Sequence, residues 1–306
     1  MKTSLDCLFC FVGQARSLGL RASTDPEVQR RLLDEAGRFL AAVDTDLAPP
    51  ENSGRLYPLF AKVLGTADPF AQVKEESNAL ALSLREEIRQ QIEQADDPLQ
   101  AAVRAAIGGN IIDYGALHSF DAAATMRDCF ARAFVLDEYL ALRQAVGTAG
   151  QKILYLCDNS GEIVFDGLLV EQLQRVGCQV TAAVRESPII NDATLADARA
   201  SGLDHICPVI SSGMSCPGTV LAQCSAEFLT HFQAADLIIS KSDTPDPVIA
   251  GQNLTYSNNS LLPTTVGGGV GYPLEFTRHW SGGQRLLADG LAVVDIELGW
   301  FDEQGE

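Results

Sequence analysis

The segment between Gly150 and Lys241 constrains the fold most, because short apolar runs alternate there with helical patterns. The apolar runs have the length and composition of strands buried on both faces, and they cover residues 153–157, 180–184, 205–210 and 237–240. Helical spacing of apolar residues separates these runs, over residues 165–176, 192–200 and 220–232. Strand, helix and strand in alternation predict an α/β fold, with a mostly parallel sheet covered by helices on both faces.

The residues before Gly150 carry helical patterns instead. Three helix starts share a capping aspartate in front of a proline, which the first turn tolerates: Asp25-Pro26, Asp68-Pro69 and Asp97-Pro98. Apolar residues recur at helical spacing after each start, and a fourth helix is expected over residues 122–146. Residues 49–54 are expected to interrupt the helices, and no alternation typical of a strand precedes Gly150. These patterns predict a helical domain over residues 1–148.

The C-terminal stretch differs in composition from the rest. Residues 242–306 are rich in Gly, Pro, Ser, Thr and Asn, and a strand is expected only over residues 291–298. The predicted domains are therefore the helical domain, an α/β metal-site domain over residues 149–241, and an atypical segment over 242–306. We expect that last segment to complete or flank the α/β domain.

Composition excludes several classes of protein. The chain has 306 residues, of which 46% are hydrophobic and 20% charged, so a folded globular protein is expected. Its formal net charge of −18 would repel nucleic acid and anionic membranes. No apolar run reaches the roughly 18 residues of a membrane span, and nothing near Met1 resembles a signal peptide. We therefore expect a soluble cytoplasmic protein whose eight cysteines are reduced thiols.

Polar residues that can hold a metal ion follow two of the predicted strands. Asp158 and Asn159 come directly after the strand ending at Cys157, and Asp192 follows the next strand. The carboxyl ends of parallel strands meet at one edge, where ligands bind, and neighbouring strands lie roughly 5 Å apart. Two carboxylates and an amide oxygen suit Mg²⁺ or Mn²⁺. Ser160-Gly161-Glu162 then opens a helix whose first amides can hold a phosphate.

Each of these features also has an ordinary structural interpretation. Asp-Asn-Ser-Gly after a strand is typical of a turn, and Asp192 taken alone is a common helix cap. The metal interpretation depends on both groups lying at the same edge of the sheet. A bound divalent ion would also supply the local positive centre that so acidic a protein needs in order to attract phosphate.

Several motifs, in order along residues 1–241, resemble those of the damage-control phosphatases, also called the acidic-residue methyltransferase-like family. The signature motif corresponds to residues 157–166, Cys-Asp-Asn-Ser-Gly-Glu-Ile-Val-Phe-Asp, and a second motif to Asn191-Asp192-Ala193-Thr194. Further segments resemble the family's helical half, its prokaryotic Cys-x-x-Cys branch and its later strands: residues 109–113, 6–10, 68–78, 217–219 and 235–241. The tail over residues 242–306 departs from the family.

The resemblance implies a helical amino-terminal domain packed on a three-layer, Rossmann-like α/β/α domain. It implies a divalent ion (Mn²⁺, Mg²⁺, Co²⁺ or Ni²⁺) held by the catalytic residues Asp158, Asn159 and Asp192. It also implies a set of substrate-binding residues: Asn110, Asp113, Lys241, Gly161 and Glu162. The implied reaction is hydrolysis of phosphate monoesters of small metabolites, including sugar phosphates and damaged metabolites. Such a metabolite is the expected partner, and neither nucleic acid nor a membrane is expected.

Two alternatives stay open at this point. A carboxyl methyltransferase using S-adenosylmethionine would need a glycine-rich loop after the first strand, where residues 158–161 supply one glycine. The other alternative is a catalytically impaired metal-binding protein, because Ser215 stands where the family commonly has an acidic residue and the segment after Lys241 departs from it. Cys7 and Cys10 form half a zinc site, and structural, metal-binding and redox roles all stay open for them.

Overall fold

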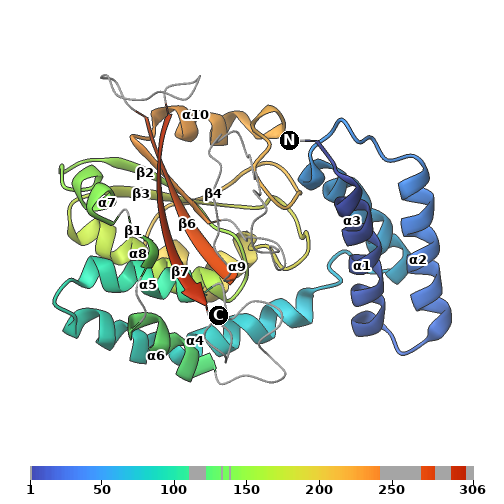
Figure 1. The fold of residues 1–306 in the computed structure, drawn as a ribbon, viewed down its shortest axis with the longest axis horizontal. Coiled ribbons are helices and arrows are strands. Elements are labelled where there is room, and N and C mark those ends of the chain that lie inside the picture. The colour runs from blue at the N-terminus through green and yellow to red at the C-terminus, as the bar shows by residue number, and fades with distance from the viewer. Residues whose placement is uncertain are drawn as a thin grey trace.

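The computed structural model describes residues 2–109, 122–131, 134–137, 139–241, 270–279 and 291–300 (Figure 1). Its α-helices are α1 (Leu5–Ala22), α2 (Pro26–Ala41), α3 (Pro49–Leu64), α4 (Ala71–Gln94), α5 (Pro98–Gly109), α6 (Ala122–Ala131), α7 (Tyr139–Ala145), α8 (Glu162–Arg175), α9 (Leu195–Ser201) and α10 (Ala226–Ala234). Short 3-10 helices cover Leu203–His205 and Leu221–Gln223. The strands are β1 (Phe134–Asp137), β2 (Lys152–Leu156), β3 (Gln179–Val184), β4 (Val209–Ser211), β5 (Leu237–Lys241), β6 (Val270–His279) and β7 (Leu291–Trp300).

These strands form one sheet in the order β1-β7-β6-β5-β2-β3-β4. The half that contains β5, β2, β3 and β4 is parallel, which confirms the predicted α/β fold. The other half is antiparallel, because β6 pairs with β5, β7 with β6 and β1 with β7. In the parallel half, Leu156 pairs with Ala183 on one side and Ser240 on the other. The carboxyl ends of β3, β2 and β5 are therefore level with one another.

Alternation along the central strand places its side chains in two different cores. Ile153 and Tyr155 of β2 belong to the large hydrophobic cluster that also contains residues of α4, α5 and α8. Leu154, which points to the opposite face, packs in a separate cluster with Phe228 of α10. The sheet is thus a middle layer with helices on both sides, as Figure 1 shows. This three-layer arrangement explains why the parallel strands are apolar without interruption.

The first three helices have a core of their own. Phe11, Leu32, Leu56 and Phe60 are almost fully buried in one cluster, together with Ile189 from the loop after β3. The bundle of α1, α2 and α3, called the helical layer below, therefore contacts one of the loops at the carboxyl edge of the sheet. The hydrophobic clusters group α4 and α5 with the sheet rather than with α1–α3. The domain boundaries at residues 148 and 241 stay a prediction.

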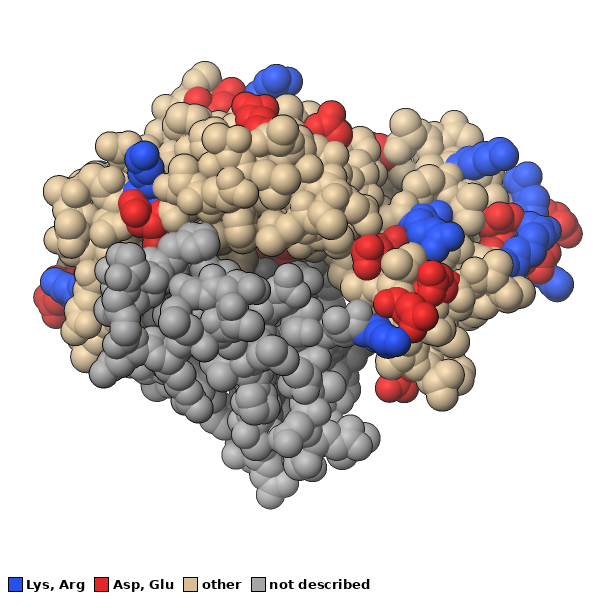
Figure 2. Space-filling model, turned by 90° about the horizontal axis from the view of Figure 1, so that it is seen from above, with Lys and Arg blue, Asp and Glu red and all other residues tan. Residues whose placement is uncertain are grey.

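Charged side chains of both signs are mixed over this helical layer, at the right of Figure 2. Three ion pairs lie within it: Lys2–Asp46, Arg30–Asp34 and Arg38–Glu35. Because basic residues there alternate with acidic ones, the face in Figure 2 offers no broad basic surface within the described residues. No helix in the described part of the chain is long and apolar enough to cross a membrane.

Two of the expected helical boundaries are wrong. Residues 49–54 were predicted to interrupt the helices, but they form the first turns of α3. The first turn tolerates proline, and the Glu51 carboxylate accepts the Ala48 N–H at 2.9 Å. The single helix predicted over residues 122–146 is α6, β1 and α7 instead. A run as short as Phe134–Asp137 becomes a strand only because β7, far along the chain, pairs with it.

Candidate functional site

The loops after β2 and β3 are joined by backbone hydrogen bonds where the sequence places its acidic residues. The Ala193 N–H donates to the Asp158 carbonyl at 2.6 Å, and the Ser160 N–H donates to the Asn191 carbonyl at 2.9 Å. Asn159 and Asp192 form an isolated antiparallel bridge. The structure thus brings together Asp158, Asn159 and Asp192 at the carboxyl edge of the sheet. Their role as metal ligands stays a prediction.

A buried arginine lies between the two carboxylates. Arg185, the residue after β3, donates from Nε to Asp192 Oδ2 at 2.7 Å, and its Nη2 lies 3.6 Å from Asp158 Oδ1. Burial alone would lower the pKa of this guanidinium, but Asp192 and Asp158 together raise it above the usual arginine value. Arg185 is 6% exposed, so these charges interact in a poorly solvated place. One cation already contacts both carboxylates, which shows that they converge.

The donor set around this point fits a hard divalent ion. Two carboxylates against one guanidinium leave one negative charge uncompensated. The Asn159 amide donates through Nδ2 to Asp158 and Glu162, both at 3.2 Å, so its carbonyl oxygen is the ligand atom it can offer. The Ser160 hydroxyl is buried and has no hydrogen-bond partner among the described residues, which is uncommon and leaves it available to a ligand.

This set contains only two carboxylates. Among the residues that the structure describes, no group of three or more His, Cys, Asp or Glu side chains is placed to hold a metal ion. The third predicted ligand is an amide oxygen. An all-oxygen set of this kind suits Mg²⁺ or Mn²⁺ better than Zn²⁺.

The first amides of α8 were expected to hold a phosphate, but the protein already supplies acceptors for several of them. Gly161 N–H donates to Asn78 Oδ1 at 2.7 Å, and the amides of Ile163 and Val164 donate to carbonyls of the preceding turn. The predicted contact of Gly161 with substrate stays a prediction, and it would not use the backbone N–H, which donates to α4. Glu162 is fully buried and accepts from Asn159. Glu162 therefore lies beside Asn159, one of the predicted metal ligands, and its own role in substrate binding stays a prediction.

The other predicted substrate-binding residues have different outcomes. Lys241 is the last residue of β5, one residue beyond Ser240, which pairs with Leu156. Its backbone therefore lies at the edge of the sheet that bears the site. Asn110 and Asp113 lie outside the described residues. The roles of all three stay predictions.

Helix α4 clamps both site loops through residues whose roles sequence reasoning missed. Asn78 accepts from Gly161 N–H and donates to Asp197 Oδ1 at 3.1 Å. Lys74 is buried and lies 2.9 Å from Asp197 Oδ2. Asp197 in turn accepts the backbone N–H and the hydroxyl of Thr194, two residues after Asp192. The resemblance had marked residues 74–78, and the structure shows that they fix the starts of α8 and α9.

Backbone strain occurs in the same region. Ile190 has a φ of 46°, which a β-branched residue rarely adopts, and it lies two residues before Asp192. Its side chain packs against the cluster of α1–α3. Contacts with the helical layer therefore hold the loop in a conformation that it would not adopt alone.

The contacts of Asp197 with Lys74 and Thr194 predict that the stability of the protein depends on pH. Burial alone would raise the pKa of Asp197, but Lys74 and Thr194 lower it below the usual aspartate value. A depressed pKa stabilises the fold above the unfolded value of about 3.9, and this contribution is lost as the pH falls through the folded value. We expect Asp197→Asn to lose about 2 kcal/mol at pH 7 and less at pH 3–4. Urea unfolding at both pH values measures this difference.

The partner variant provides the control for this prediction. In the Asp197→Asn background, Lys74→Met should cost less stability than it does in the parent, because the ion pair with Asp197 is already gone and only the longer pair with Asp68, at 3.3 Å, is left to lose. If Asp197→Asn lost the same stability at both pH values, the negative charge of Asp197 would not contribute to the stability of the fold.

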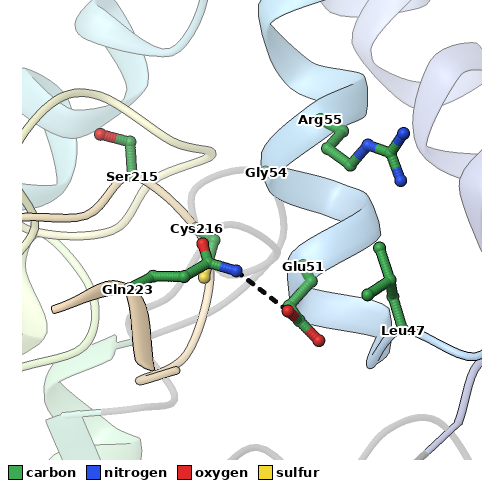
Figure 3. Close-up of a pocket in the computed structure, with 7 residues that line it drawn as sticks. All are labelled: Leu47, Glu51, Gly54, Arg55, Ser215, Cys216 and Gln223. Atoms are coloured by element: carbon green, nitrogen blue, oxygen red, sulfur yellow. Dashed lines mark hydrogen bonds between the residues drawn. The ribbon is translucent and has the colours of Figure 1, made fainter. Parts of the chain in front are cut away.

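A cavity of about 270 Å³ lies beside the site, between α3 and the loop after β4. Figure 3 shows its lining, which is Leu47, Glu51, Gly54, Arg55, Ser215, Cys216 and Gln223. Gln223, at the end of the 3-10 helix Leu221–Gln223, donates to Glu51 of α3 at 2.9 Å. Gly54 permits the close approach of α3, because an added Cβ would lie 2.8 Å from Cys216 Cβ. Two residues beyond Cys216, the Gly218 carbonyl accepts from Arg185 Nη1 at 2.9 Å, so one loop serves both cavity and site.

Cys216, which lines the cavity, is held as a neutral thiol. Burial raises the pKa of Cys216 to about 12, although Arg185 opposes the shift. A neutral thiol is a poor nucleophile and a poor metal ligand, so Cys216 contributes shape to the cavity. Cys7 is half-buried and Cys10 is exposed on α1. The three roles left open for that pair stay open.

Known proteins resemble this chain over the helices and the parallel half of the sheet, residues 3–244. Residues 3–244 match the model of a family described as the damage-control phosphatase ARMT1-like domain. The chain is 33% identical over 244 residues to the damage-control phosphatase PH1575 of Pyrococcus horikoshii, covering 79% of this chain and 84% of that relative. It is 31% identical over 248 residues to a damage-control phosphatase of Archaeoglobus fulgidus, covering 79% and 85%.

A solved structure supports the fold independently. The crystal structure of PH1575, described as a DUF89 family protein, aligns with this chain at a TM-score of 0.71 and 30% sequence identity. The alignment covers 78% of this chain and 83% of that one. The family match ends close to Lys241, the point at which the C-terminal segment was predicted to depart.

Proposed function

This chain belongs to the damage-control phosphatase ARMT1-like family, and from that premise we propose that it is a metal-dependent phosphatase acting on phosphate monoesters of small metabolites. Membership of this family supports a phosphatase role in metabolite repair. Metal dependence, sugar-phosphate substrates and a cytoplasmic location are the finer parts of the proposal. So is the absence of nucleic-acid and membrane partners.

The observation that carries the proposal is the convergence of Asp158 and Asp192 on one cation. Both carboxylates contact the Arg185 guanidinium, and Asn159, the residue after Asp158, forms a backbone bridge with Asp192. An ion held by these three residues would polarise a phosphoryl oxygen and lower the pKa of a bound water. Phosphoryl transfer needs mainly positioning and charge stabilisation, which such a site can supply.

The remaining tasks fall to residues of the chain itself. The hydrogen bonds from Asn159 to Asp158 and Glu162 fix the orientation of its amide. The buried Ser160 hydroxyl can donate to a phosphate oxygen, since no protein acceptor uses it. Arg185 adds a positive charge beside the same point. With several of the α8 amides already bonded, side chains rather than backbone would recognise the phosphate.

The cavity lined by α3 and the Ser215 loop supports a small substrate. Its volume of about 270 Å³ is slightly below the roughly 300 Å³ at which typical ligand pockets begin, so only a small group would fit. The lining combines an acid, a base, a hydroxyl and an amide with a single large apolar side chain, Leu47. This chemistry suits a hydroxylated organic group such as a sugar. We place the non-phosphate part of the substrate there, with Lys241, Asn110 and Asp113 as further contacts from the family resemblance.

No observation favours the methyltransferase alternative. The loop after β2 contains one glycine, Gly161, and this residue is packed against Ser77 of α4. A catalytically impaired protein stays the alternative that activity measurements exclude.

Metal removal tests the proposed function. Purified protein is expected to release phosphate from p-nitrophenyl phosphate in the presence of Mn²⁺, Mg²⁺ or Co²⁺. Treatment with EDTA should lower the rate by at least about a hundredfold, and added Mn²⁺ should restore it. A panel of sugar phosphates then identifies the preferred substrate. A rate that EDTA leaves unchanged would contradict metal dependence, and no hydrolysis with any metal or substrate would favour the impaired protein.

A further inference from the structure

We propose that Arg185 is a resident cation, which holds Asp158 and Asp192 together in the metal-free protein and competes with the divalent ion for them. The inference rests on the proposed metal site and adds a means of regulating its occupancy. It assigns a positioning role to a residue outside the predicted ligand set.

The contacts of Arg185 are unequal, and this inequality matters. Nε lies 2.7 Å from Asp192 Oδ2, whereas Nη2 lies 3.6 Å from Asp158 Oδ1. The guanidinium is therefore bonded firmly to one carboxylate and held near the other by charge. Asp158 is the more exposed partner, with 20% of its side chain accessible against 5% for Asp192. An ion arriving from solvent would reach Asp158 first.

Arg185 has a second set of partners that does not involve the carboxylates. Nη1 donates to the Gly218 carbonyl at 2.9 Å and lies 3.5 Å from Thr219 Oγ1. Its backbone N–H donates to the Ala193 carbonyl. The side chain can thus release Asp158 and Asp192 while its backbone and one nitrogen stay anchored. A buried arginine needs such an anchor, because an unpartnered buried charge is strongly destabilising.

The charges at the site determine whether removing Arg185 strengthens or weakens metal binding. Two carboxylates with Arg185 carry a net charge of minus one, and without it they carry minus two. A divalent ion is attracted more strongly in the second case, and it is also no longer repelled by the guanidinium. Removing Arg185 should therefore tighten metal binding. By linkage, metal binding weakens the hold of Arg185 on the carboxylates to the same extent.

The same arithmetic predicts the opposite sign for phosphate. Whatever charge the neighbouring Glu162 carries, the metal-loaded site is one unit more positive with Arg185 than without it. A phosphate dianion is therefore attracted more strongly when Arg185 is present. A residue that only supported the fold would weaken both ligands when it was removed. Opposite changes in metal and phosphate affinity are the signature of a resident cation.

The test compares metal-free wild-type protein with Arg185→Gln by calorimetry with Mn²⁺. We expect Mn²⁺ to bind Arg185→Gln at least about tenfold more tightly, and inorganic phosphate to inhibit the loaded variant at least about threefold less strongly. In thermal unfolding, the metal-free variant should be less stable than wild type, and Mn²⁺ should raise its melting temperature by the larger amount. Arg89→Gln is the control, because it removes the same charge and breaks an ion pair with Glu171 away from the site.

A measurement on the unmodified protein covers the case in which Arg185→Gln does not fold. The Arg185 Nε–H signal, assigned by its disappearance in Arg185→Lys, should shift and lose protection from hydrogen exchange when Mg²⁺ is added. Equal or weaker Mn²⁺ binding by Arg185→Gln, or an Nε–H signal unchanged by bound Mg²⁺, would overturn this inference alone. Absence of metal binding by both wild type and variant would overturn the proposed metal site as well.

Discussion

Asp158→Ala should abolish phosphatase activity, lowering the rate of phosphate release by at least about a thousandfold at saturating Mn²⁺. The substitution removes one of the two carboxylates that converge on Arg185. Arg185 would then neutralise Asp192, the remaining partner at 2.7 Å, and little negative charge would be left to attract a divalent ion. Hydrolysis of p-nitrophenyl phosphate, measured across a range of Mn²⁺ concentrations, separates lost turnover from weakened metal binding.

An aspartate at the opposite edge of the sheet provides the control. Asp236 precedes β5 and accepts the Lys152 N–H at 2.9 Å, at the amino end of β2. Asp236→Ala should leave turnover within about twofold of the parent and lower stability by roughly 1 kcal/mol. Activity that survives in a folded Asp158→Ala protein would show that the chemistry takes place elsewhere.

Gly161→Ala should destabilise the protein by about 2–4 kcal/mol and impair activity as well. Gly161 has a φ of 83°, and an added Cβ would lie 3.0 Å from both the Cβ and the carbonyl oxygen of Ser77. Backbone of α4 cannot yield as a flexible side chain would. Relief of the contact must move the turn that begins α8, and with it Asn159 and Ser160.

Gly150→Ala separates the two causes of this loss. Gly150 has nearly the same φ, 85°, but an added Cβ there would meet nothing within 4 Å. Its replacement should cost only the left-handed conformation, about 1 kcal/mol. Urea unfolding of both variants gives the difference, which is the contribution of the α4 contact. Equal losses in the two variants would mean that Ser77 moves aside freely.

The fold was predictable where local patterns decide the structure. Uninterrupted apolar runs after Gly150 predicted β2, β3 and β5, because a strand buried on both faces needs no polar side chains. The antiparallel half of the sheet was not predictable in this way. Phe134–Asp137 is too short for its sequence pattern to predict a strand, and it forms one because β7 pairs with it. Residues 49–54 misled for another reason, since two prolines and a glycine resemble a turn. The prolines suit a first helical turn, and Gly54 lies further along α3, where it is packed against Cys216.

The convergence of the candidate site residues was predictable from sequence, and their surroundings were less so. Residues that follow strand ends share an edge of the sheet, so Asp158 and Asp192 could be paired from sequence. The contribution of α4 could not, because Asn78 meets Gly161 and Asp197 only through long-range packing. Arg185 offered one clue, its position directly after a predicted strand. Its partners, Gly218 and Thr219, lie on a loop whose path no local pattern predicts.

The position of the two carboxylates in the chain has a consequence for biosynthesis. Asp158 and Asp192 are joined by one β–α–β unit and its loop, residues 152–192, and β3 pairs with β2 within that stretch. On the ribosome, this unit emerges well before β5, β6 and β7, which complete the sheet. A nascent chain can thus bring together the two carboxylates of the proposed metal site before β5 has paired with the other side of β2. Capture of an ion or of Arg185 at that stage would protect an otherwise repulsive pair until translation ends.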